Sequence, residues 1–133
     1  MTEKTFAACD DTLNDALAFV EEELEKLDCP MKINMMIAVS VEEVFVNIAH
    51  YAYGGETGRM HLAVMPEEGG VAIRFRDSGM PFDPLMRDDP DITLSAEERQ
   101  IGGLGIYMVK KSMDDVIYSR EDGENILTIK KRF

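Results

Sequence analysis

The stretch from about residue 31 to residue 52 has the pattern of a helix that is apolar on nearly every side. Between Met35 and Val41 the apolar residues are almost continuous, which predicts deep burial of this part of the helix. The run is far shorter than the roughly 20 apolar residues that a membrane-spanning helix needs. Gly54 and Gly55 follow it and are expected to end the helix. This element is therefore predicted to lie inside a folded domain.

Length and charge limit the kind of partner. A chain of 133 residues is enough for one globular domain, here expected over 1–133. Its formal net charge of −12 repels phosphate backbones and anionic lipid, which argues against direct contact with nucleic acid or with a membrane. A small anion is not excluded, because backbone amides and a divalent cation can hold it. Two cysteines and a polar MTEKTF start, without a signal peptide, predict a cytoplasmic protein.

The remaining hydrophobic patterns predict two further helices and several strands. Helices are expected at about 13–27, 31–52 and 104–113, and strands at about 2–8, 60–65, 71–76, 116–120 and 126–131. Thr12 and Asp15 have the spacing of a capping box before the first helix. Each of the last two strand pairs is predicted to form a hairpin, the second turning at Asp122-Gly123. Three helices with four or five mostly antiparallel strands predict a two-layer α/β sandwich.

Three polar residues interrupt the apolar helix. Glu43, Asn47 and His50 lie at i, i+4 and i+7, so they are expected to share one face. In one interpretation Glu43 lies on a solvated edge and Asn47 bonds a neighbouring loop. In the other, Glu43 accepts a proton and the Asn47 carbonyl oxygen binds Mg²⁺, a hard cation that takes few protein ligands.

A second polar cluster follows a predicted strand, in the segment Asp77-Ser78-Gly79-Met80-Pro81-Phe82-Asp83-Pro84. Turn residues of this kind often only end a strand. The functional alternative is that the Asp77 carboxylate accepts a hydrogen bond from an exocyclic amine such as that of adenine. Gly79 would then let the base lie close to the backbone.

A third feature is the sequence Gly102-Gly103-Leu104-Gly105, which opens the last predicted helix. Glycines there expose backbone N–H groups at a helix N-terminus, an arrangement that favours phosphate. It is neither a P-loop nor a dinucleotide-binding fingerprint, because no Gly-Lys-Ser/Thr follows and Met108 replaces the third glycine. The irregular stretch before it, from Asp77 to Ile101, is long for so small a domain, and such loops are usually functional or disordered.

The order of these three features resembles that of the Bergerat-fold ATPases. Glu-x-x-x-Asn on a helix, Asp-x-Gly-x-Pro-Phe-Asp-Pro after a strand, and Gly-Gly-Leu-Gly at a helix start all occur in sequence. Within this superfamily, which includes the histidine kinases, the chain most resembles the anti-sigma factor serine/threonine kinases. The resemblance implies a mostly antiparallel mixed sheet with three helices on one face.

The resemblance also implies roles for individual residues. Asn47 would hold Mg²⁺, Asp77 would read adenine, and Glu43 would be the catalytic base. Gly79, Gly102, Gly103, Leu104 and Gly105 would line the ATP, beneath a lid formed by residues 85–101. His50 would approach the phosphates. Apart from the resemblance, Arg99 lies three residues before Gly102, so a lid that closed over ATP would bring it to the phosphates. The alternative is that Arg87 and Arg99 only neutralise neighbouring carboxylates in solvent.

The function implied is phosphorylation of a small anti-sigma factor antagonist, coupled to sequestering a sigma factor, in a protein that commonly forms a homodimer. Two alternatives remain open at this point, since phosphoryl transfer needs positioning more than special residue types. One is a non-catalytic nucleotide-dependent protein-binding module, and the other is a simple ATP hydrolase.

Overall fold

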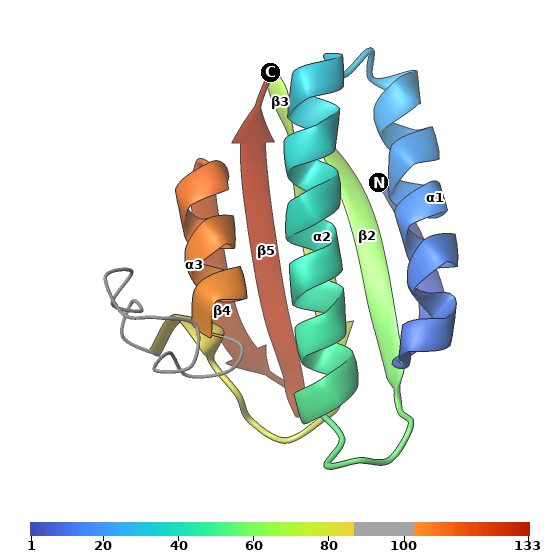
Figure 1. The fold of residues 1–133 in the computed structure, drawn as a ribbon, viewed down its shortest axis with the longest axis vertical. Coiled ribbons are helices and arrows are strands. Elements are labelled where there is room, and N and C mark those ends of the chain that lie inside the picture. Colours follow the sequence, from blue (N-terminus) through green and yellow to red (C-terminus); the bar gives the residue numbers. More distant parts are fainter. Residues whose placement is uncertain (87–102) are drawn as a thin grey trace.

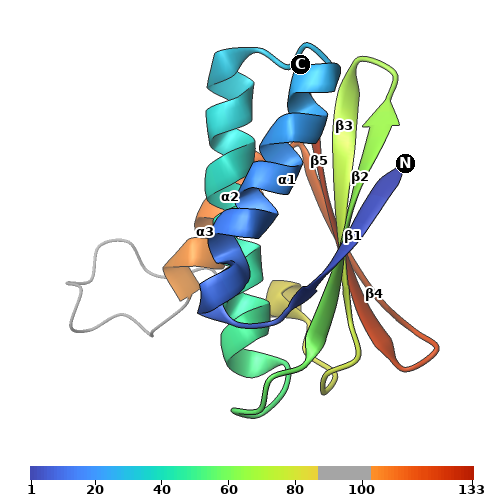
Figure 2. The same cartoon turned by 90° about the vertical axis from the view of Figure 1, so that its right-hand side faces the viewer.

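Three helices pack on one face of a five-stranded sheet, as Figure 2 shows in side view. The structure is a computed structural model, and it describes residues 1–86 and 103–133. The strands are β1 (Thr2–Ala7), β2 (Arg59–Glu67), β3 (Gly70–Asp77), β4 (Asp115–Glu121) and β5 (Glu124–Arg132). The helices are α1 (Leu13–Lys26), α2 (Met31–Tyr51) and α3 (Gly103–Ser112), with short 3-10 turns at Asp10–Thr12 and Pro84–Met86. The two-layer sandwich predicted from the sequence is confirmed.

The strands are ordered β1-β2-β3-β5-β4 across the sheet. All pairings among the described strands are antiparallel, so the parallel pair that a mixed sheet would contain is not found there. Both hairpins predicted from the sequence are confirmed. Asp122 and Gly123 turn the second with φ of 51° and 78°, the left-handed values that a two-residue hairpin requires.

Helix α2 lies in the middle of the helical layer, between α1 and α3 (Figure 1). The capping box predicted before α1 is wrong. The Thr12 hydroxyl does not cap the helix but donates to the carbonyl oxygens of Ala7, at 2.6 Å, and Cys9, at 3.1 Å. The residue instead fixes the turn that joins β1 to α1, because both carbonyls precede the helix.

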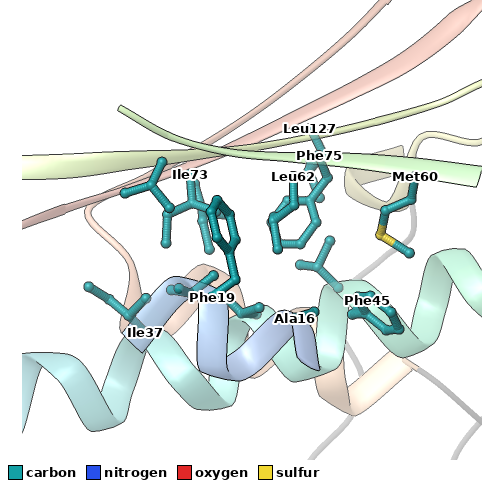
Figure 3. Close-up of a cluster of buried hydrophobic side chains, with 14 of the residues drawn as sticks. Ala16, Phe19, Ile37, Phe45, Met60, Leu62, Ile73, Phe75 and Leu127 are labelled. Carbon is teal, nitrogen blue, oxygen red and sulfur yellow. The ribbon is translucent and has the colours of Figure 1, made fainter. Parts of the chain in front are cut away.

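The core lies between the helices and the sheet, where Ile37 and Phe45 of α2 meet Leu62 and Phe75 of the strands (Figure 3). Deep burial of α2 on all sides, predicted from its composition, is wrong. Met35 is 64% exposed and Val39 is 55% exposed.

Met35 and Val39 are exposed because the sheet covers only one side of α2, and no second layer among the described residues covers the other side. Among the described helices, α2 alone is long and apolar enough to be considered as a membrane span. In this structure the buried face of α2 forms part of the hydrophobic core, with Ile37, Val41 and Phe45 packed against the sheet.

The other face of the sheet carries an ion-pair network that ties the edge strand β1 to its neighbours. The Glu3 carboxylate accepts hydrogen bonds from Arg74 at 2.9 Å and from Arg76 at 3.1 Å. Arg76 also donates to Glu124 on β5 at 3.0 Å. Partial burial alone would raise the pKa of Glu3, but the hydrogen bonds and charges of the two arginines outweigh it and lower that pKa.

Candidate functional site

Three elements meet at one end of the molecule: the C-terminal end of α2, the segment after β3, and the start of α3 (Figure 1). A pocket lies between them, with a mostly apolar wall and a few buried polar groups. Its lining consists of Val44, Asn47, Ile48, Ala52, Asp77, Phe82, Pro84, Ile106, Tyr118, Asn125 and Leu127. The Phe82 ring stacks on Tyr51, with ring centroids 6.2 Å apart. A mostly apolar lining with a few convergent polar groups is the usual composition of a small-molecule site.

Asp77 is the last residue of β3 and is only 3% exposed. Its Oδ1 accepts two hydrogen bonds, each of 3.0 Å, from the backbone N–H of Gly79 and from Nδ2 of Asn125. No donor from the described residues reaches its Oδ2. The pocket wall therefore holds a carboxylate with one oxygen left to accept a hydrogen bond from a ligand.

Asn125 and Tyr118 belong to the pocket, and the sequence analysis missed both. Asn125 is the second residue of β5 and alternates with Leu127 and Ile129, which point into the core. A polar residue on the inward face of a strand was the signal that could have identified it. Tyr118, on the neighbouring strand β4, donates to Asn125 Oδ1 at 2.5 Å.

Gly79 is required by close packing within the protein. A Cβ atom at this position would lie 2.2 Å from the carbonyl oxygen of Ala52, at the end of α2. The same oxygen accepts a hydrogen bond of 2.8 Å from the Met80 N–H. The Gly79 carbonyl accepts one of 2.9 Å from Arg120 of β4. The segment after β3 is thus fixed against both α2 and β4, which holds Asp77 in place.

Asn47 and Glu43 lie one turn apart on α2. Asn47 is 9% exposed, and its side-chain amide has no hydrogen-bond partner among residues 1–86 and 103–133. Glu43 is half-buried and lies against the first turn of α3, since a Cβ atom on Gly105 would be 2.2 Å from its Oε2. Neither atom of this amide is fully enclosed, so the group is accessible to a ligand on the pocket side of α2.

The donor set near the pocket fits one kind of metal site. The described residues contain no cluster of three His, Cys, Asp or Glu side chains that could enclose an ion. Mg²⁺ does not need such a cluster, because it keeps several waters and takes one or two protein oxygens together with phosphate. The Asn47 amide oxygen is a ligand of that type.

His50 does not line the pocket, although its spacing predicted that it would share a face with Asn47. It is exposed, and its Nε2 lies 3.0 Å from both carboxylate oxygens of Asp10. His50 therefore points to the turn before α1, whereas Asn47, Ile48 and Ala52 on either side of it line the pocket.

Some of the predicted site residues cannot be placed against the pocket. Arg99 and Gly102 lie outside the described residues, as do residues 87–101 of the predicted lid. Gly103 begins α3, followed by Leu104 and Gly105 in its first turn. The predicted glycine-rich helix start is therefore present at the same end of the molecule as Asp77 and Asn47.

A two-layer sandwich with an apolar pocket, a buried aspartate at a strand end and a glycine-rich helix start defines a class, that of nucleotide-binding ATPase domains. The family is shown directly by sequence. The chain belongs to the histidine kinase-like ATPase domain family, whose sequence pattern matches residues 6–131.

Several curated relatives carry kinase names. The chain is 26% identical over 119 residues to the serine/threonine-protein kinase BtrW of Bordetella bronchiseptica, covering 89% of this chain and 84% of that protein. It is 28% identical over 99 residues to the serine-protein kinase RsbW of Listeria monocytogenes, and 31% identical over 101 residues to RsbW of Bacillus thuringiensis. These matches cover 71% and 73% of this chain but only 63% and 62% of the two RsbW proteins.

The fold also has a counterpart among solved structures. A chain in the crystal structure of the SiaB–SiaC complex from Pseudomonas aeruginosa superposes with a TM-score of 0.59, covering 98% of this chain and 89% of that one. Sequence identity is 15%, so this likeness supports the fold alone.

Proposed function

We propose that this protein is an ATP-dependent serine/threonine kinase that acts in the cytoplasm on a small antagonist protein, in a circuit that controls a sigma factor. The kinase names of BtrW and RsbW support the reaction. The sigma factor, the antagonist and a homodimeric state come from the resemblance of the motifs to anti-sigma factor kinases. Release of a sequestered sigma factor would link the phosphorylation state of the antagonist to transcription.

One observation carries the proposal. Asp77 and Asn47 come from different elements, yet both are buried in the lining of one pocket. Each has a hydrogen-bonding atom that no described residue uses. An acceptor for a base amine and an oxygen ligand for a metal ion are two groups that a site for Mg·ATP needs.

The chain's own residues would act in three ways. Asp77 Oδ2 would accept a hydrogen bond from the adenine amine, and the Asn47 amide oxygen would hold the metal ion. Bound Mg²⁺ would supply charge neutralisation at the phosphates. The Glu43 carboxylate would accept the proton of the attacking serine or threonine hydroxyl, and the backbone N–H groups at the start of α3 favour negative charge there.

The test separates binding from catalysis. Isothermal calorimetry of the purified protein with ATP and Mg²⁺ measures binding. The protein is then loaded with ATP or ADP and used to capture partners from a lysate. Phosphosites on the captured proteins are mapped to detect phosphoryl transfer. Glu43→Gln is expected to keep ATP affinity within about threefold and to lower phosphoryl transfer about 100-fold or more. Glu42→Gln, next to it on the exposed side of α2, is the matched control and should transfer normally.

The outcomes distinguish the three functions. ATP-dependent capture with a new phosphosite supports the kinase. Capture that depends on ATP without any phosphosite favours a protein-binding module, and turnover of ATP without a phosphorylated protein favours a hydrolase. Failure to bind ATP with Mg²⁺ would refute all three.

A further inference from the structure

Asn125 is 6% exposed, and its side-chain amide makes its full set of hydrogen bonds. Its Nδ2 donates to Asp77 Oδ1 at 3.0 Å and to the Met80 carbonyl at 2.8 Å. Its Oδ1 accepts from the Phe82 N–H at 3.3 Å and from the Tyr118 hydroxyl at 2.5 Å. A reversed amide would place donors against donors and acceptors against acceptors, so the orientation of Asn125 is fixed.

The fixed amide in turn fixes Asp77. Both protein donors to this carboxylate, from Gly79 and Asn125, point at the same oxygen, Oδ1. A carboxylate oxygen can only accept hydrogen bonds, and Oδ1 already accepts two. The pocket is therefore expected to offer the ligand an acceptor at Oδ2 and no donor from this side chain.

The sheet holds this arrangement rigidly. Asp77 and Asn125 are cross-strand partners in the β3–β5 ladder, and Tyr118 comes from β4 on the far side of β5. The relative position of the two side chains is thus set by backbone pairing and not by a loop.

We propose that Asn125 and Tyr118 are positioning residues that make the pocket select a purine with a 6-amino group over one with a 6-oxo group. The inference rests on the proposed binding of ATP. The amine of adenine can donate to Asp77 Oδ2. A 6-oxo group would face the same oxygen as a second acceptor, which is a repulsive pairing.

The test compares ATP with inosine triphosphate, which carries a 6-oxo group, by calorimetry of each variant in Mg²⁺. The wild-type protein should prefer ATP by about tenfold or more. In Asp77→Asn, the donors from Gly79 and Asn125 require the amide oxygen at the Oδ1 position, so the amide nitrogen faces the pocket. The preference should then be lost or reversed in favour of inosine triphosphate.

Removing the positioning groups should weaken selection in a graded way. Asn125→Leu should lower the ATP-to-inosine triphosphate affinity ratio about tenfold, and Tyr118→Phe should lower it about threefold. The double variant Asp77→Asn with Asn125→Leu should reverse the preference between ATP and inosine triphosphate less than Asp77→Asn alone. Asn34→Leu, on α2 and outside the pocket lining, is the control and should leave the ratio unchanged.

The affinity ratio separates positioning from a purely structural role. If Asn125→Leu and Tyr118→Phe weaken both nucleotides by the same factor, the inference is wrong, although the proposed function stands. If the wild-type protein binds neither nucleotide, the proposed function itself fails. Thermal unfolding checks that each variant is folded, and Tyr118→Phe decides the question should Asn125→Leu not fold.

Discussion

The side-chain amide of Asn47 is the clearest case of a single residue that the fold does not explain by itself. It lines the pocket and lacks a hydrogen-bond partner among the described residues, which leaves its oxygen available to a metal ion. We expect Asn47→Ala to weaken Mg·ATP about tenfold or more, and to change the affinity for metal-free ATP much less. Calorimetry with Mg²⁺ or with a chelator measures both values.

The control for that substitution is Asn34→Ala, on the same helix and remote from the pocket lining. It should leave both affinities unchanged. Equal loss of affinity with and without metal in Asn47→Ala would show that the residue shapes the pocket and does not hold the ion.

Gly105 offers a second experiment on one residue, because its missing side chain leaves space for the Glu43 carboxylate. In Gly105→Ala the new Cβ would lie 2.2 Å from Oε2, so the carboxylate has to move. Alanine also favours a helix, so stability should stay the same or rise by about 1 kcal/mol. Turnover of ATP should nevertheless fall about tenfold or more, because Glu43 is displaced.

Thermal unfolding and an ATP turnover assay on the same protein test this combination. Ser112→Ala, at the other end of α3, is the matched control for a changed helix residue. A Gly105→Ala protein with normal turnover would mean that the position of the Glu43 carboxylate does not matter for the reaction.

Among the secondary-structure elements, the edge strand β1 is held by charge in addition to its antiparallel pairing with β2. Glu3 accepts hydrogen bonds from Arg74 and Arg76 of β3, across the intervening strand β2. Glu3→Gln should lower the free energy of unfolding by about 1 kcal/mol at pH 7. Burial opposes the charged form, but the arginines lower the pKa of Glu3 below its usual 4.5, so this stabilisation is present above that pH.

As the pH falls through the lowered pKa, the wild-type carboxylate takes up a proton and the difference between the two proteins should disappear. Urea unfolding at about pH 7, 5, 4 and 3 follows this change. Glu68→Gln, exposed in the β2–β3 turn, should differ little from wild type at any pH. A difference that persists unchanged at pH 3 would exclude charge as its cause.

The elements differ in how far the sequence predicted them. Hairpins were predictable because alternation and Gly-containing turns are local signals, as at Asp122-Gly123. The exposure of Met35 and Val39 was not, since the same apolar residues fit a helix covered on one side or on both. Asp77 was found through its motif, whereas the inward-facing polar residue Asn125 was assigned to the pocket through its pairing with Asp77 across the sheet.

For the whole molecule, the net charge of −12 leads us to expect that salt changes the affinity for nucleotide. Free ATP carries more negative charge than Mg·ATP, so its binding should be opposed more strongly by the field of the protein. Raising the ionic strength from about 25 to about 300 mM screens that field. We expect the affinity for metal-free ATP to rise relative to that for Mg·ATP, which parallel titrations at constant pH would measure. A relative fall would point to local positive groups that outweigh the net charge.

The pairing of Asp77 with Asn125 also has a consequence for folding. These residues are far apart in the chain and meet only when β3 and β5 are joined, and Asn47 reaches the same pocket only when α2 has packed on the sheet. The pocket therefore requires a completed tertiary structure, so a ligand that fills it stabilises the native state alone and raises the unfolding temperature of the entire domain. A chain that stops at a partly folded stage has no complete pocket, and nucleotide occupancy thereby reports that the sheet has been assembled to its last strand.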